Sequence, residues 1–361
     1  MAHDGRTAPG VFRHGVLLTG VGYGVNIVLL LAETVLIVRW LPAEEFGTVV
    51  LFQTTVTFLV MAIDFGCRTA AARFIAAEAE QRPAIVSSLM AFRFILLAVA
   101  ALLILVVRVP LAALTRSELW AGLILYVPAV LFFASFDELL AGMLQGFQVY
   151  SRLAKAQILR STLRLSLTAG LLLGLKLGIM AVVWAWLVSF ACSALYQWLG
   201  LPRPWHFGLD RALLRRLLRF GLPLQLTRFL WFTLQRVDVF LLATLAGPAS
   251  VAFYEVAARI PLAFQRLSEA YFAVFLPTLS ERFAQGGHAA AELLLARSIR
   301  LLSFMALCAT WGAALFGTDI IRLLFSARYT ASGPAFGLLM LAFTFSLTAN
   351  LMGYTLTALG R

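Results

Sequence analysis

Charged side chains are scarce in this chain of 361 residues. Lys, Arg, Asp and Glu together make up 13% of the sequence, against about 25% in an ordinary soluble domain. Hydrophobic residues make up 61%, and many of them stand in long uninterrupted stretches. This composition excludes an ordinary soluble globular protein and indicates an integral membrane protein.

Cysteine and histidine are also rare, and their positions are scattered. The three cysteines form no CxxC pair, and the four histidines have no spacing that is typical of metal ligands. We therefore expect neither a disulfide framework nor a metal site. The residues concerned are Cys67, Cys192, Cys308, His3, His14, His206 and His288.

A phosphate-binding loop is missing too. Gly20, Gly22 and Gly24 resemble a glycine-rich loop, but no strand precedes them and no Gly-Lys-Ser/Thr follows. Gly20 and Gly24 are better interpreted as small residues that allow close helix packing. We expect no ATP site, no cofactor and no enzymatic activity.

Apolar stretches of the length needed to cross a bilayer, about 20 residues for a helix, recur from end to end. Ten such stretches predict an all-α integral membrane protein, a polytopic helical bundle. The first stretch is too long for the apolar part of a secretory signal, so we expect it to remain as a span. The expected spans cover residues 15–37, 45–64, 88–107, 118–142, 156–175, 178–200, 220–245, 250–277, 298–316 and 334–357.

The net charge of +12 is unevenly distributed between the connecting segments. With the N-terminus on the cytoplasmic side, inside segments carry 17 Lys and Arg, outside segments carry 6, and the spans carry the other 6. This bias follows the positive-inside rule and predicts a multi-pass protein with a cytoplasmic N-terminus. The basicity needs no nucleic-acid partner.

A basic segment interrupts the apolar pattern at LPRPWHFGLDRALLRRLLR, residues 201–219. Asp210 is placed to cap a short amphipathic helix, which we expect on the cytoplasmic leaflet. The alternative is a basic loop that only anchors the topology. The segment predicts three parts: a six-helix N-terminal lobe (1–200), a linker (201–219) and an incomplete four-helix C-terminal lobe (220–361).

The sequence after this segment repeats features of the N-terminal sequence. Arg13-His14-Gly15 precedes Pro42-Ala43, and Arg219-Phe220-Gly221 precedes Pro248-Ala249, with an offset of 206 in both places. Six spans separate the copies, so both enter the membrane in the same direction. Parallel repeats predict two lobes around a central cavity. The shorter second half favours a fragment that lacks about two or more helices over a natural variant with a reduced second bundle.

Charged side chains inside spans are costly and usually face a protein interior or a water-filled cavity. At 100° per residue, the seventh and eighth expected spans each present one polar stripe. The first half adds further charges near its spans. The seventh-span stripe is Gln225, Arg228, Gln235 and Arg236, with Asp238 outside it; the eighth-span stripe is Glu255, Arg259, Arg266 and Glu269; the first half has Glu33, Asp64, Arg93, Asp137 and Arg164.

Two interpretations of these charges remain open. In the first interpretation, the charged residues form buried ion pairs that fix the registry of the helices. The spacing of Glu255 and Arg259 is favourable for such a pair. Alternatively, arginines without a carboxylate on their stripe bind an anionic substrate, since guanidinium binds phosphate oxygens bidentately. The candidate substrate-binding residues are Arg228, Arg236, Arg259, Arg266, Gln225 and Gln235, and the candidate coupling or gating residues are Asp64, Asp238, Glu255 and Glu269.

Three segments resemble a known family. They are VRWLPAEEFGTVVLFQTTVTFLVMAIDFG (38–66), LLRFGLPLQLTRFLWFTLQRVDVFLLATLAGPASVAFYEVAARI (217–260) and FLPTLSERFAQG (275–286). Their order and spacing resemble the polysaccharide biosynthesis and oligosaccharide flippase family of the multidrug/oligosaccharidyl-lipid/polysaccharide exporter superfamily. The resemblance implies 12 to 14 helices in two lobes around a central cavity.

The resemblance also implies a function. Members of this family flip undecaprenyl-pyrophosphate-linked oligosaccharide across the bacterial inner membrane by alternating access, with cavity arginines on the pyrophosphate. The implied partners are this lipid, the bilayer, and glycosyltransferases or a polymerase of the same pathway. The alternatives are a cation-coupled multidrug exporter of the same superfamily and a non-transporting scaffold for glycosyltransferases.

Overall fold

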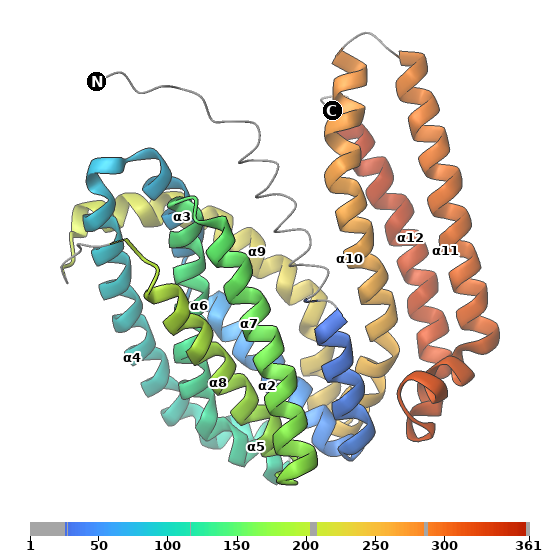
Figure 1. The fold of residues 1–361 in the computed structure, drawn as a ribbon. Helices are drawn as coiled ribbons and strands as arrows, with labels where there is room; N and C mark the ends of the chain where they lie inside the picture. The colour runs from blue at the N-terminus through green and yellow to red at the C-terminus, as the bar shows by residue number, and fades with distance from the viewer. Residues whose placement is uncertain (1–25, 27, 116, 203–207, 285–287, 359–361) are drawn as a thin grey trace. The chain divides into compact units, whose positions relative to one another are not determined.

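The computed structural model describes residues 26, 28–115, 117–202, 208–284 and 288–358. These residues form helices and short connections, with no strand among them (Figure 1). The all-α fold class is therefore confirmed. The chain divides into two compact units, unit 1 (Met1–Val251) and unit 2 (Ala252–Arg361), whereas we expected lobes to meet at 201–219. The expected lobe boundaries stay predictions.

Unit 1 contains a first helix over residues 28–40 and most of the other elements. They are α2 (Ala43–Ala62), α3 (Cys67–Ala77), η1 (Ala79–Gln81), α4 (Arg82–Thr115), α5 (Glu118–Leu123), η2 (Ile124–Tyr126), α6 (Val127–Gly146), α7 (Tyr150–Ala169), η3 (Gly170–Gly174), α8 (Ile179–Trp198) and α9 (Arg211–Leu245). The long helix α10 (Pro248–Ala284) begins at the end of unit 1. Unit 2 continues with α11 (His288–Leu324), η4 (Ala327–Ser332) and α12 (Gly333–Ala358).

Six helical segments among the described residues are long and apolar enough to cross a membrane. They overlap six of the ten expected spans. The other four are not confirmed by this criterion and stay predictions. Of the first of them, 15–37, only residues 26 and 28–37 are described. The six segments are Ala43–Ala62, Ala79–Val106, Glu118–Gly146, Ile179–Trp198, Ala289–Leu324 and Ala327–Ala358.

The described part of the repeat has the same local structure in both copies. A helix ends at residue 40 and α2 begins at Ala43, directly after Pro42. Similarly, α9 ends at Leu245 and α10 begins at Pro248, after Gly247 with a positive φ of 82°. Proline suits the first turn of a helix because its missing N–H has no helical partner there. Arg13-His14-Gly15 lies outside the described residues.

Helix α9 differs from the expected arrangement at the linker. Asp210 caps it as expected, because its Oδ1 accepts from the N–H groups of Ala212 (2.9 Å) and Leu213 (3.0 Å). The helix then continues without a break to Leu245, so the basic segment and the following span form one rod. Pro223 lies inside this helix, as membrane helices tolerate.

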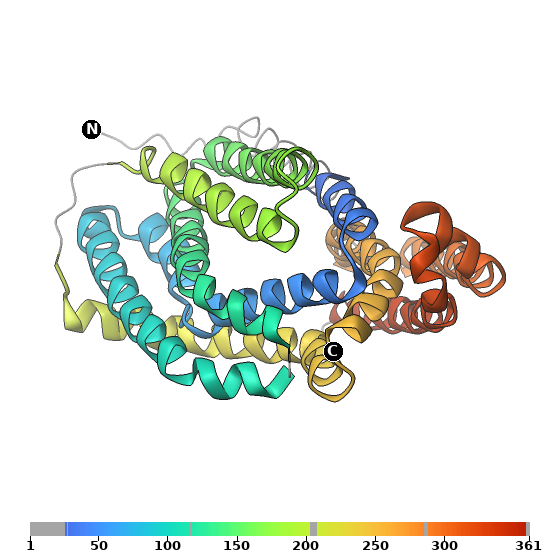
Figure 2. The same cartoon turned by 90° about the horizontal axis from the view of Figure 1, so that it is seen from below.

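Helix α6 lies at the centre of unit 1. It packs against α2, α3, α4, α7 and α8, and Figure 2 shows it between α4 on one side and α7 and α8 on the other. Its buried side chains include Leu139, Leu140 and Met143. The buried polar groups of this helix need hydrogen-bond partners on its neighbours, because burial removes them from water.

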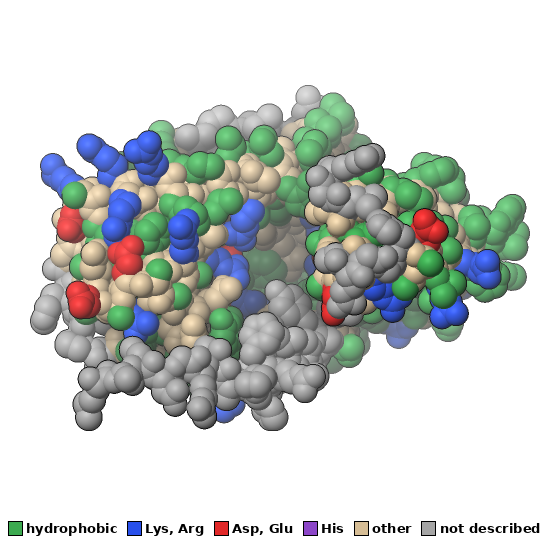
Figure 3. Space-filling view, turned by 90° about the horizontal axis from the view of Figure 1, so that it is seen from above, with side chains coloured by type: hydrophobic (Ala, Val, Ile, Leu, Met, Phe, Trp, Pro, Cys, Tyr) green, Lys and Arg blue, Asp and Glu red, His purple; other side chains and the backbone are tan. Residues whose placement is uncertain are grey.

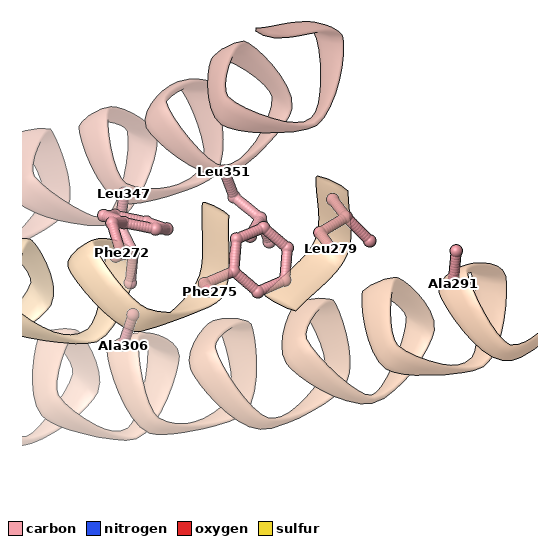
Figure 4. Close-up of a cluster of buried hydrophobic side chains, with 7 residues drawn as sticks. All are labelled: Phe272, Phe275, Leu279, Ala291, Ala306, Leu347 and Leu351. Atoms are coloured by element: carbon pink, nitrogen blue, oxygen red, sulfur yellow. The ribbon is translucent and has the colours of Figure 1, made fainter. Parts of the chain in front are cut away.

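Unit 2 has its own apolar cluster, drawn in Figure 4. On α10 the residues at positions i, i+3 and i+7 share one helix face, and this face packs against α11 and α12. Thr310 and Thr344 add a hydrogen bond of 2.8 Å between α11 and α12. The cluster consists of Phe272, Phe275 and Leu279 from α10, Ala291 and Ala306 from α11, and Leu347 and Leu351 from α12.

Candidate functional site

Two consecutive carboxylates of α6 make contacts with different neighbours. Asp137 is buried and forms an ion pair with Arg160 of α7. It also accepts hydrogen bonds from Ser193 Oγ (2.5 Å) and Gln197 Nε2 (2.6 Å) of α8. Because its oxygens have partners on both helices, this carboxylate joins α6 to α7 and α8.

Glu138, the next residue, lies between two arginines. Arg68 of α3 forms an ion pair with its Oε1, and Arg228 of α9 lies 3.5 Å from the same oxygen. The side chains of Arg68, Glu138 and Arg228 keep 31%, 28% and 38% of their surface exposed. Two guanidinium groups and one carboxylate thus form a partly exposed cluster, which we call the Glu138 cluster.

The sequence of α6 explains why α3 comes so close. Gly142 and Gly146 follow Glu138 at intervals of four residues, on the same face of the helix. A Cβ on Gly142 would lie 2.6 Å from the carbonyl oxygen of Arg68, and a Cβ on Gly146 would lie 2.8 Å from that of Ala71. This small-xxx-small contact brings the backbones together, and it places Arg68 beside Glu138.

A second polar cluster is fully buried. Arg93 of α4 is 0% exposed, and its Nη2 lies 2.5 Å from Oδ1 of Asp64, in the connection between α2 and α3. Its Nη1 donates to Ser135 Oγ of α6 at 2.7 Å. Burial and the ion pair hold Arg93 inside unit 1. The pair joins three helical segments, which fits a structural role.

Glu33 and Arg164 form a third buried pair. Arg164 Nε lies 2.6 Å from Glu33 Oε2, and Thr168 donates to Glu33 Oε1 at 3.4 Å. The Arg164 guanidinium also lies over the ring of Trp186, 5.4 Å from its centroid. These contacts tie the first helix to α7 and α8.

The stripe expected on α9 divides into residues with different surroundings. Gln225 is buried, and its Nε2 donates to the carbonyl oxygen of Met61 at 2.5 Å, while Arg228 belongs to the Glu138 cluster. Gln235 is exposed, and Arg236 is partly exposed. Within unit 1, Gln225 therefore contacts α2, and Arg228 contacts Glu138 of α6. The partly exposed Asp238 accepts from the N–H of Val239 (2.8 Å).

On α10, in unit 2, Glu255 and Arg259 form the ion pair that their spacing predicts, with 3.0 Å between Nη2 and Oε1. Glu255 is buried, whereas Arg266 and Glu269 are exposed. Arg228 and Arg236 belong to the other unit. The shared cavity that we expected between the two stripes stays a prediction.

Sequence reasoning missed Arg68, Glu138 and Arg160. Glu138 directly follows Asp137 and begins the i, i+4, i+8 series with two glycines, which was a readable signal. Arg68 lies at the start of α3 and Arg160 in the middle of α7, and neither gave a comparable signal in the sequence. In the described residues, no three His, Cys, Asp or Glu side chains come together as a metal site would require.

Several solved structures share the fold of this chain. One is described as the inward-facing conformation of a multidrug resistance MATE family transporter of the MOP superfamily: it is 19% identical, with 92% of this chain and 82% of that chain covered and a TM-score of 0.68. Another is a MATE in complex with MaL6 (19% identity, 96% and 81% coverage, TM-score 0.62).

A third similar structure is described as a MOP superfamily transporter from Pyrococcus furiosus in which reversed polarity of the binding pocket suggests a different function. It is 19% identical, with 97% of this chain and 83% of that chain covered and a TM-score of 0.58. At this identity the likeness shows the fold alone. The chain thus has the fold of the multi-pass transporters of this superfamily.

The family is shown by sequence. A family model described as polysaccharide biosynthesis protein matches residues 12–283, so the chain belongs to the polysaccharide biosynthesis protein family. The chain thus belongs to this family and has the fold of the transporters above, and its long apolar helices support a multi-pass membrane protein. None of the curated proteins matches the chain significantly.

Proposed function

We propose that this protein is a flippase that moves lipid-linked oligosaccharide, carried on undecaprenyl pyrophosphate, across the bacterial inner membrane. It works by alternating access between two lobes. The partners are this lipid, the bilayer and the glycosyltransferases or polymerase that make and use the oligosaccharide. The family match supports the polysaccharide pathway, and the charge of the Glu138 cluster supports the chemistry of the headgroup.

The observation that carries the proposal is the sharing of Glu138 by Arg68 and Arg228. Pyrophosphate offers several oxygens with negative charge, and a guanidinium binds two of them at once. The cluster is partly exposed and brings two guanidinium groups together, so such an anion can reach both of them. We assign Arg68 and Arg228 the role of direct contacts to the pyrophosphate.

Arg236, Arg259, Arg266, Gln225 and Gln235 remain proposed substrate contacts from the sequence, and Asp64, Asp238, Glu255 and Glu269 remain proposed coupling or gating residues. Among these, Arg236 is the first to test, since it is partly exposed on the same helix as Arg228. Asp64 and Glu255 each already have an arginine partner. A coupling role for them requires that this ion pair opens during transport.

The second candidate is a cation-coupled multidrug exporter. It is favoured by the fold relatives described as multidrug resistance transporters. Such a protein would bind lipophilic cations through carboxylates, and the half-exposed Glu138 would then be the acceptor. The third candidate, a non-transporting scaffold for glycosyltransferases, predicts that the protein cannot be trapped in distinct inward-open and outward-open states.

The test is binding of the purified full chain to a polyprenyl-pyrophosphate oligosaccharide, in competition with a lipophilic cation. We expect the lipid to bind, the cation not to compete, and Arg68→Ala and Arg228→Ala each to weaken binding by about tenfold, equal to about 1.4 kcal/mol. Arg236→Ala is measured in parallel. The matched control is Arg297→Ala, an exposed arginine of α11.

Opposite results have definite meanings. If the cation binds and Glu138→Gln abolishes its binding while the arginine variants do not matter, the protein is an exporter of the second kind. If the lipid binds equally well to the wild-type protein and to both variants of the Glu138 cluster, the flippase proposal survives but the assignment of the site is wrong. Polysaccharide export in cells that carry each full-length variant provides the functional measurement.

A further inference from the structure

The first turns of α9 present a row of arginines to the outside of unit 1. Arg211, Arg215 and Arg219 are exposed and follow one another at intervals of four residues. Figure 3 shows Lys and Arg side chains gathered on the end of unit 1 that is seen from above, where α9 begins. Like charges in one row repel each other, so an anion in contact with the row is stabilising.

A second row of the same helix lies beside the first. Leu214, Leu218 and Leu222 follow at the same interval, three residues after each arginine, which places the two rows next to each other on the helix surface. Between them lies a shallow surface hollow of about 470 Å³. It is lined by Arg211, Leu214, Arg215, Leu218, Arg219 and Leu222.

The opposite face of this helical segment is held by specific contacts. Leu213 and Leu217 are buried, and Arg216 Nη2 lies 2.5 Å from Glu78 Oε2. The N–H of Asp210 donates to Ser88 Oγ of α4 at 3.2 Å. One turn later a Cβ on Gly221 would lie 2.6 Å from the carbonyl oxygen of Gly66. The segment therefore cannot rotate, and the arginine row stays on the outside.

The length of α9 sets the depth of the two rows. Its 35 residues extend over about 52 Å at 1.5 Å per residue, whereas a hydrocarbon core is about 30 Å thick. The basic end must lie outside the hydrocarbon if the apolar part spans it. The leucine row continues into that part with Leu226 and Leu230, which are 59% and 54% exposed. The arginine row, at the level of the lipid headgroups, is therefore next to a continuous row of leucines that leads into the hydrocarbon.

We propose that this face of α9 binds an anionic phospholipid of the surrounding leaflet. The phosphate contacts Arg211, Arg215 and Arg219, and one acyl chain follows the leucine row toward the membrane core. Neither the family nor the proposed transport of oligosaccharide requires this site. A resident lipid here fixes the height of α9 in the membrane and the position of the helices that are attached to its inner face.

The experiment counts bound lipid on the full chain by native mass spectrometry. The protein is equilibrated with vesicles of equal parts phosphatidylglycerol and phosphatidylcholine, and we expect phosphatidylglycerol to remain bound preferentially. Arg211→Gln/Arg215→Gln lowers the affinity by about tenfold or more, because each basic residue near the surface contributes about 1 kcal/mol. Both arginines are exposed, so the variant is expected to fold normally.

Arg297→Gln/Arg300→Gln on α11 is the matched control, since both side chains are exposed and the change of charge is the same. Equal loss in the two double variants, or no preference for phosphatidylglycerol in the wild-type protein, overturns the proposal. Glycerol phosphate, which has no acyl chains, is the second probe. If it binds as tightly as phosphatidylglycerol, the leucine row plays no part and the site is not a phospholipid site.

The two proposals fail independently. Loss of phospholipid binding in Arg211→Gln/Arg215→Gln, with unchanged binding of the polyprenyl-pyrophosphate oligosaccharide, supports the lipid site and leaves the proposed function untouched. Equal loss of both ligands shows that this row holds the transported lipid instead, which overturns the resident phospholipid.

Discussion

Glu138 has two arginine partners, Arg68 and Arg228. It neutralises only one of the two charges, and all three side chains remain partly exposed. Ion pairs in such a setting are weak, with typical contributions of about 0 to 1 kcal/mol. An incoming anion therefore competes with Glu138 for the guanidinium groups at modest cost, which is a useful property for a site that must bind and release.

Replacement of Glu138 by Gln removes this competitor. We expect the affinity for a pyrophosphate lipid to rise by up to about fivefold, the equivalent of about 1 kcal/mol. Release becomes slower, so transport declines although binding improves. Equilibrium binding and single-turnover transport with the purified chain measure both effects. Asp137→Asn, next to it but in another cluster, is the control; weaker binding by the Glu138 variant contradicts the prediction.

Cys67 allows a test of packing near the same helices. It is buried at the start of α3, and burial raises the pKa of its thiol to about 12. A raised pKa favours the neutral thiol at all lower pH values, and the thiolate is the form that reacts. We expect Cys67 to resist maleimide in the native protein from pH 7 to 9 and to react fully after unfolding. Rapid native labelling, read by mass spectrometry in a Cys192→Ser/Cys308→Ser background, contradicts this packing.

Contacts between residues close in the sequence can be predicted from the sequence, whereas contacts between distant residues cannot. The ion pair of Glu255 and Arg259 followed from their spacing on one helix, and the structure has it. Arg68 and Glu138 are 70 residues apart, and nothing local connects them. Their contact depends on how α3 packs against α6, so only a tertiary structure reveals it.

At the scale of elements, two glycines of α6 determine the position of the Glu138 cluster. Gly142 and Gly146 let α3 approach until the side chain of Arg68 meets Glu138. The same pattern was recognised from sequence at Gly20 and Gly24, but those residues lie outside the described part. Two glycines four residues apart thus indicate a helix face that another helix can approach closely, but not which residue that helix brings.

A larger residue at Gly142 should separate the two helices. We expect Gly142→Ala to destabilise the protein by about 1 to 3 kcal/mol, because the added methyl group meets backbone atoms of α3 that cannot move aside. Binding of a pyrophosphate lipid should weaken with it. Gly122→Ala in α5 is the control, since a Cβ there meets nothing within 4 Å. Equal thermal stability of the two variants in detergent would count against the close contact.

The long rod of α9 was the element least accessible from sequence. The charge pattern changes sharply between residues 219 and 220, and this change suggested two elements. Helix formation does not follow hydropathy. Gly221 and Pro223 are usual signals of a helix end, yet both lie inside α9, because membrane helices tolerate Gly and Pro. The cap at Asp210 was predictable because capping is a local interaction.

At the scale of the whole molecule, the repeat predicts which loops share a side of the membrane. With a cytoplasmic N-terminus, the segment before α9 is inside and η4 is outside. In a cysteine-free background, Ala327→Cys should react with a membrane-impermeant maleimide in intact cells, and Leu209→Cys should react only after the cells are opened. Both positions are exposed. The reverse pattern would invert the assigned orientation.

The ion pairs of unit 1 also have an electrical consequence. Three buried carboxylates, Glu33, Asp64 and Asp137, each have one arginine partner, so these pairs carry no net charge. The cluster at Glu138 keeps one positive charge in excess. If transport moves this charge across the membrane potential, the work amounts to about 2.3 kcal/mol per 100 mV for a complete crossing. A bound anion cancels the charge or reverses it. The membrane potential therefore acts differently on the empty and the loaded protein. The charge of the transported lipid decides whether the potential drives the conformational change of the loaded protein or that of the empty protein.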